Sequence, residues 1–143
     1  MDALINLTVV RTDPVRAFRV NVVGAYNVAK AAVACGIRRV VHTGPIFLNA
    51  SHVADYQYDF DIPDEAPIHA GTELYMITKR LAEETMRAFA ERAGLEVLTL
   101  RFSRFLPGDG GNLPDGSGVP RYTTSWEDAG EAFRCALQAP LPR

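Results

Sequence analysis

The sequence predicts an α/β fold in which helices cover a parallel sheet. Short apolar runs rich in β-branched residues alternate with longer segments whose apolar residues recur at helical spacing, and this alternation is typical of parallel sheets. The chain has 143 residues, 48% of them hydrophobic, which suits one domain with a single core. We therefore expect a single domain over residues 1–143.

The first part of the chain predicts a strand, a helix and a second strand. ALINLTVV at 3–10 is a short apolar run, typical of a buried strand. Asp13 and Pro14 then provide an N-cap and a first-turn proline for a helix. That helix is expected to end just before Gly36, which stands where a C-terminal glycine belongs. RRVVHT at 38–43 is the second predicted strand.

The second part predicts two more helices, a strand and two loops. The expected bounds are a loop at 49–71, a helix at 73–93, a strand at 95–102, a loop at 107–120 and a helix at 125–138. Gly94 marks the end of the first of these helices. The loop at 107–120 is rich in glycine and proline, and a loop as long as the one at 49–71 is usually functional or mobile.

Composition excludes several classes of function. Fifteen basic and 17 acidic residues leave a net charge of -2, which gives no electrostatic signal for nucleic acid or an anionic membrane. No stretch approaches the roughly 20 apolar residues that span a bilayer, and the N-terminus lacks the basic start of a signal peptide. We expect a cytoplasmic protein with no metal site. Cys35 and Cys135 match no metal or redox spacing and are predicted to be buried free thiols.

Tyr75 and Lys79 are the strongest chemical signal in the chain. They stand four residues apart near the start of a predicted helix, so their side chains share one face. A lysine cation beside a phenol, together with the helix dipole, is expected to lower the pKa of the tyrosine. The tyrosine could then act as an acid or base nearer neutral pH. An ordinary helix surface also explains such a pair, so the surrounding sequence decides.

The surrounding segments carry a resemblance to a known family. They are DALINLT near the start, RVNVVGAYNVAKAAVACGIRRVVHT at 19–43, DEAPIHAGTELYMITKRLAEE at 64–84, LTLRF at 98–102 and WEDAGEAFRCAL at 126–137. In this order they resemble the extended short-chain dehydrogenase/reductase family, the NAD-dependent epimerases and dehydratases. The resemblance implies a partial Rossmann-like domain that starts at the family's fourth strand, with helices on both faces of the sheet.

The resemblance also implies an activity. Tyr75 would exchange a proton with a small-molecule substrate that carries a hydroxyl or carbonyl group, nucleotide sugars included. Lys79 would hold the ribose of NAD or NADP and lower the pKa of Tyr75. Tyr75 and Asn21 would also lie near the cofactor, while Leu7 and Thr8 would pass under it.

Four further positions complete the expected site or depart from the family pattern. Arg101 would fix a wall of the site. Arg104 stands where the family often carries an asparagine for substrate, so we assign it to substrate binding. The family's serine or threonine aligns with Gly44, and the neighbouring Thr43 supplies the catalytic hydroxyl if the strand end shifts by one residue.

The family's glycine-rich turn is not found in the sequence, and the loop at 108–118 does not replace it. We therefore expect that binding of NAD or NADP needs the first strands from a complementing chain or from sequence outside these residues. The alternative is a catalytically inactive member that acts as a dimerising or scaffolding module. An apolar strand edge at 3–10 and two long helices also predict a homodimer.

Overall fold

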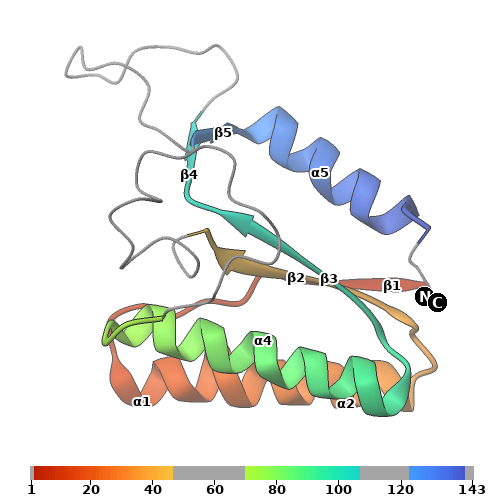
Figure 1. The fold of residues 1–143 in the computed structure, drawn as a ribbon, viewed down its shortest axis with the longest axis horizontal. Coiled ribbons are helices and arrows are strands. Elements are labelled where there is room, and N and C mark those ends of the chain that lie inside the picture. The colour runs from red at the N-terminus through yellow and green to blue at the C-terminus, as the bar shows by residue number, and fades with distance from the viewer. Residues whose placement is uncertain (1, 47–69, 107–122, 141–143) are drawn as a thin grey trace.

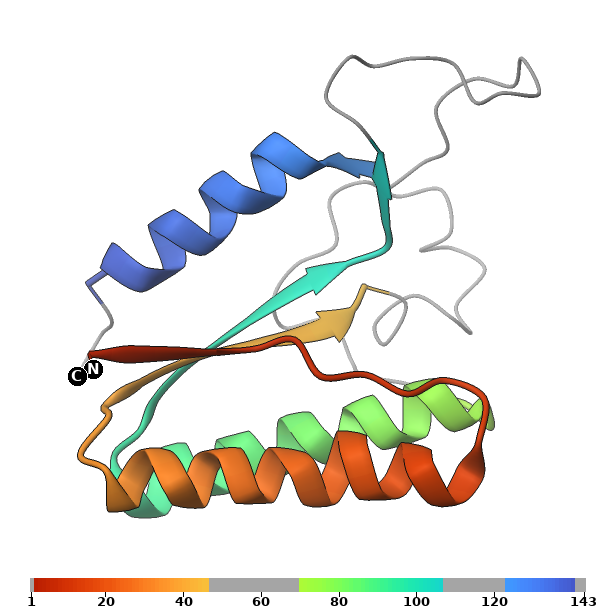
Figure 2. The same cartoon turned by 180° about the vertical axis from the view of Figure 1, so that it is seen from behind.

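A computed structural model of the chain describes residues 2–46, 70–106 and 123–140. Its main sheet has three parallel strands in the order β1-β2-β3. Strand β1 spans Ala3–Asn6, β2 spans Arg39–Pro45 and β3 spans Glu96–Phe102. The long helices α2 and α4 cover one face of this sheet and α5 covers the other (Figures 1 and 2). The predicted α/β class, with a parallel sheet and helices on both faces, is confirmed.

The first helical segment is continuous but changes its winding partway. It comprises α1 (Pro14–Ala17), a π-helical stretch η1 (Phe18–Val23) and α2 (Gly24–Ala34). The Oδ1 atom of Asp13 accepts a hydrogen bond of 2.7 Å from the backbone N–H of Arg16, so the predicted N-cap is confirmed. Gly36 follows the helix with φ +69°, the left-handed conformation that favours glycine.

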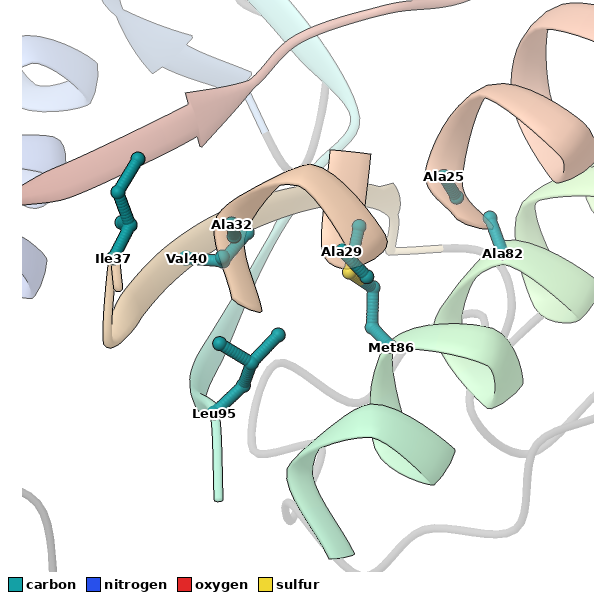
Figure 3. Close-up of a cluster of buried hydrophobic side chains, with 8 residues drawn as sticks. All are labelled: Ala25, Ala29, Ala32, Ile37, Val40, Ala82, Met86 and Leu95. Carbon is teal, nitrogen blue, oxygen red and sulfur yellow. The ribbon is translucent and has the colours of Figure 1, made fainter. Parts of the chain in front are cut away.

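Helix α4 (Leu74–Ala93) lies beside α2 under the sheet and ends at Gly94, as the sequence predicts. Small side chains on the two facing helices allow them to approach each other and the strands closely. The buried cluster that results is formed by Ala25, Ala29, Ala32, Ile37, Val40, Ala82, Met86 and Leu95 (Figure 3). This core fixes the position of α4, and therefore of Tyr75 and Lys79, relative to the sheet.

Helix α5 (Trp126–Gln138) begins after Ser125, whose Oγ accepts a 2.9 Å hydrogen bond from the N–H of Asp128. The predicted last helix is thus confirmed. Two short parallel strands, β4 (Arg104–Leu106) and β5 (Thr123–Ser125), form a second sheet just before it. The sequence did not predict them, because three residues are too few to show a period.

Strand β1 is shorter than the predicted strand at 3–10. The Oδ1 atom of Asn6 accepts hydrogen bonds from the N–H and the hydroxyl of Thr8, at 3.2 and 2.8 Å. A side chain that bonds to the backbone two residues later replaces the strand ladder with a turn. The chain therefore leaves the sheet after Asn6.

Two other expectations are affected by the structure. Cys35 and Cys135 are free but exposed, so the prediction of buried thiols is wrong. Each lies near the C-terminal end of a helix on its outward side, where the apolar spacing does not require burial.

The loops predicted at 49–71 and 107–120 lie outside the described residues, apart from positions 70 and 71. Among the described helices, none has the length and apolarity required to cross a membrane.

Candidate active site

A cavity of about 410 Å³ lies where the carboxyl ends of the strands meet. In open parallel sheets this edge is the usual place for a ligand. Its polar groups come from three elements and its remaining wall is apolar and aromatic. The lining residues are Leu7, Val9, Arg11, Thr43, Gly44, Tyr75, Lys79, Phe102, Ser103, Phe105, Trp126, Ala129, Gly130 and Phe133.

The structure brings Tyr75 and Lys79 together at this cavity, on the first two turns of α4. Burial raises the pKa of Tyr75, a nearby Arg11 lowers it, and Glu73 raises it. The net direction is upward. The expectation that Lys79 and the helix dipole lower this pKa is therefore wrong, because the loss of solvent around the phenol outweighs the nearby positive charge.

Lys79 is almost fully buried, with 2% of its surface exposed. Burial lowers its pKa to about 8, while the carboxylate of Glu83 acts in the opposite direction and Arg11 lowers the pKa further. A positively charged group that lines an apolar cavity is a strong hydrogen-bond donor for a ligand hydroxyl. Lys79 is thus placed to hold such a group.

His42 is buried in the central strand β2, next to the cavity residue Thr43, and burial and the charge of Lys79 lower its pKa to about 3. The Nδ1 atom lies 3.2 Å from the side-chain amide of Asn6. Since the Oδ1 atom of Asn6 already accepts from Thr8, this amide donates to Nδ1, and the neutral ring carries its proton on Nε2. Nε2 has no hydrogen-bond partner among the described residues.

Thr43 and Gly44 face different sides of β2. Thr43 lines the cavity, and its hydroxyl donates a 3.1 Å hydrogen bond to the backbone oxygen of Asn6. A Cβ atom added to Gly44 would overlap the Oε1 of Glu83, whose carboxylate is paired with Arg101 at 2.9 Å. A side chain at position 44 would therefore meet a buried ion pair under the sheet, and Thr43 is the residue that brings a hydroxyl to the cavity. Arg101 holds this ion pair and does not line the cavity itself.

Asn21 lies behind the cavity wall and does not line the cavity. Its Oδ1 accepts from the N–H of Val10 at 2.9 Å, and its Nδ2 donates to the Val10 oxygen at 2.7 Å and to Thr78 Oγ1 at 2.9 Å. Asn21 therefore fixes the chain between β1 and α1, which forms one wall. Of the two residues expected under the cofactor, Leu7 lines the cavity and Thr8 is turned toward Asn6.

The sequence analysis did not identify the cation of Arg11 or the aromatic rings that complete the cavity. The guanidinium of Arg11 lies 4.4 Å from the centre of the Tyr75 ring. Phe105 and Trp126 stack with ring centres 4.8 Å apart. These pairs are distant in sequence, so no local spacing could reveal them. Arg104, expected to bind substrate, is exposed in β4 and does not line the cavity.

Comparisons with known proteins identify the family. A model of the NAD dependent epimerase/dehydratase family matches residues 2–137. The L-arabinose 1-dehydrogenase (NAD(P)(+)) of Haloferax volcanii is 29% identical, and the match covers 87% of this chain and 54% of that protein.

Solved structures show the same fold. Bordetella bronchiseptica WbmH, in complex with NAD⁺, superposes with a TM-score of 0.73 at 21% identity, over 96% of this chain and 49% of that one. The UDP-N-acetylglucosamine 4-epimerase of Methanobrevibacter ruminantium gives a TM-score of 0.77 at 13% identity, over 98% and 52% of the two chains. The chain spans about half the length of these relatives. The predicted resemblance is confirmed, and with it the NAD(P) dependence of the relatives. The chain belongs to the NAD dependent epimerase/dehydratase family.

Proposed function

We propose that this chain carries the proton-transfer half of an NAD(P)-dependent oxidoreductase or epimerase site. The substrate is a small molecule with a hydroxyl or carbonyl group, nucleotide sugars included. The observation that carries the proposal is the placement of Tyr75, Lys79 and Thr43 around one cavity at the carboxyl ends of the strands. A proton donor, a cation and a second hydroxyl at one cavity are the groups that carbonyl reduction needs.

The cavity fits the nicotinamide end of the cofactor. Flat aromatic and apolar walls suit a planar ring, and the buried Lys79 ammonium suits the ribose hydroxyls beside it. When bound, the cofactor supplies or accepts the hydride. Tyr75 gives a proton to the substrate oxygen or takes one from it, and Thr43 supplies a second hydroxyl beside the same oxygen.

We further propose that residues outside this 143-residue sequence complete the dinucleotide site, either on the same polypeptide or on a second one, because the family's glycine-rich turn is not among these residues. In the second case a complementing polypeptide would supply that turn and the first strands. A second copy of the chain could associate through the first helix and α4, where apolar side chains such as Val15, Val23 and Leu81 are exposed.

The test is a titration of NADH fluorescence with the purified chain, alone and mixed with a candidate complementing polypeptide. We expect fluorescence enhancement that Lys79→Ala removes and Tyr75→Phe largely retains, since the first variant loses the positive charge proposed to hold the ribose and the second loses a single hydroxyl. Lys30→Ala is the matched control, because Lys30 lies on α2 away from the cavity. In a turnover assay Tyr75→Phe should lower the rate by roughly 10²–10⁴-fold.

The alternative is an inactive member that serves as a dimerising or scaffolding module. Two observations favour it: burial raises the Tyr75 pKa, and the carboxylate of Glu83 occupies the space beside Gly44. If NADH fluorescence does not change with either preparation, or if Tyr75→Phe turns over as fast as the wild type, this alternative replaces the catalytic proposal.

A further inference from the structure

The guanidinium of Arg11, an exposed side chain, lies over the ring of Tyr75 at the cavity. Its guanidinium carbon lies 4.4 Å from the ring centre, within the range of a cation–π contact, and both residues line the cavity. We propose that Arg11 is a positioning residue of this site, which acts through Tyr75 by holding its ring and stabilising its phenolate. This inference rests on the proposed function, in which Tyr75 transfers the proton.

The backbone that carries Arg11 is held so that its side chain faces the cavity. Residues at alternate positions of this segment, Leu7, Val9 and Arg11, line the cavity. The two residues between them are held by hydrogen bonds. Thr8 donates to the side chain of Asn6, and the backbone of Val10 forms two hydrogen bonds with the side chain of Asn21. The orientation of Arg11 is thus set by buried hydrogen bonds in the segment that precedes it.

The same asparagine also reaches the turn that carries Tyr75. The Nδ2 atom of Asn21 donates to Thr78 Oγ1, and this hydroxyl lies 3.0 Å from the carbonyl oxygens of Leu74 and Tyr75. The segments that carry Arg11 and Tyr75 are therefore both held by the buried side chain of Asn21, although the two residues are 64 positions apart in the sequence. The stacked geometry follows from this shared anchor.

Among the charged groups around Tyr75, Arg11 is the one that favours the phenolate. Burial and Glu73 raise the pKa of Tyr75, and Arg11 is the group that lowers it. Lys79 lies on the same helix, but Glu83 partly offsets its charge, and the nearby His42 is neutral. Within residues 2–46, 70–106 and 123–140, Arg11 forms no ion pair, so its charge remains available to the phenol.

The consequence for proton transfer is direct. When Tyr75 gives its hydroxyl proton to a substrate oxygen, the O–H bond of the tyrosine breaks, a substrate O–H bond forms, and a phenolate remains. Arg11 faces that phenolate and stabilises it relative to the neutral phenol. In the reverse reaction the Tyr75 phenolate accepts a proton from the substrate hydroxyl, and the same contact stabilises that phenolate beforehand.

The test needs neither cofactor nor substrate, so its outcome is independent of the test of the proposed function. The chain is labelled with ¹³Cζ-tyrosine and titrated by NMR, and the Tyr75 signal is assigned by its loss in Tyr75→Phe. In Arg11→Met the Tyr75 midpoint should move to higher pH, so that less phenolate is present at a given pH. Arg11→Lys should restore part of the effect, because lysine keeps the charge without the planar stack. Arg16→Met, which removes an exposed arginine of α1, should change nothing.

Two results would overturn the inference. One is an unchanged Tyr75 midpoint in Arg11→Met, with a wild-type amide spectrum elsewhere showing that the variant is folded. The other is the absence of an upfield ring-current shift for the Arg11 Hδ protons in the wild type, since a stacked arginine must show one and must lose it in Tyr75→Leu. The second measurement tests the geometry even if the titration cannot be completed before the chain unfolds.

Discussion

Replacing Gly44 by alanine tests how closely α4 packs under the end of β2. The added Cβ would overlap the Oε1 of Glu83, an atom at the tip of a side chain that is only 7% exposed and paired with Arg101 at 2.9 Å. Either the carboxylate moves and the ion pair is lost, or the strand shifts. Overpacking in a core costs about 1–3 kcal/mol, and a partly exposed ion pair contributes up to about 1 kcal/mol.

The free energy of unfolding should therefore fall by about 1–3 kcal/mol in Gly44→Ala, measured by urea denaturation. Gly130→Ala is the control, because a Cβ there meets nothing within 4 Å. In a Glu83→Ala background the space is free, so the same glycine replacement should cost less than about 0.5 kcal/mol. An equal loss of stability in both backgrounds would refute the reasoning. Gly44→Ser should suffer the same loss as Gly44→Ala and bring no hydroxyl to the cavity.

Two further predictions concern pH and association. The pKa of His42 falls from its usual 6.5 to about 3 on folding, so the unfolded chain binds the proton first as the pH drops. Stability should then decrease between pH 6.5 and 3, by up to about 1.4 kcal/mol per pH unit, and urea denaturation of His42→Phe should show a flatter dependence. The exposed apolar side chains of Val15 and Val23 predict self-association: light scattering should give a mass above 15.7 kDa, and Val23→Lys should lower it. A wild-type monomer at micromolar concentration would contradict this prediction.

The elements that sequence predicts well are those fixed by neighbouring residues. The N-cap at Asp13 and the left-handed glycines Gly36 and Gly94 depend on a few adjacent positions, so the bounds of the long helices follow from the sequence. The placement of Tyr75 and Lys79 on one face follows from the helical period. The end of β1 could not be predicted, because it depends on the hydrogen bonds that Asn6 Oδ1 accepts from Thr8, which no period in the sequence reveals.

What sequence could not predict depends on distant contacts. The direction of the Tyr75 pKa is set by burial and by Arg11, which approaches from another segment. The part played by Gly44 depends on Glu83, a residue of α4 that packs under the strand end. The resemblance suggested that Asn21 lies near the cofactor, but its bonds to Val10 and Thr78 could only be seen in the folded chain.

The hydrogen bonds of Asn21 have a mechanical consequence. They join the segment before α1 to the start of α4, which are two walls of the cavity that come from distant parts of the chain. Neither wall can move away from the other without breaking these bonds, so the two behave as one cooperative unit in local opening. A displacement of the Tyr75 turn should therefore carry the segment of Arg11 with it, so that the contact between the two side chains is preserved.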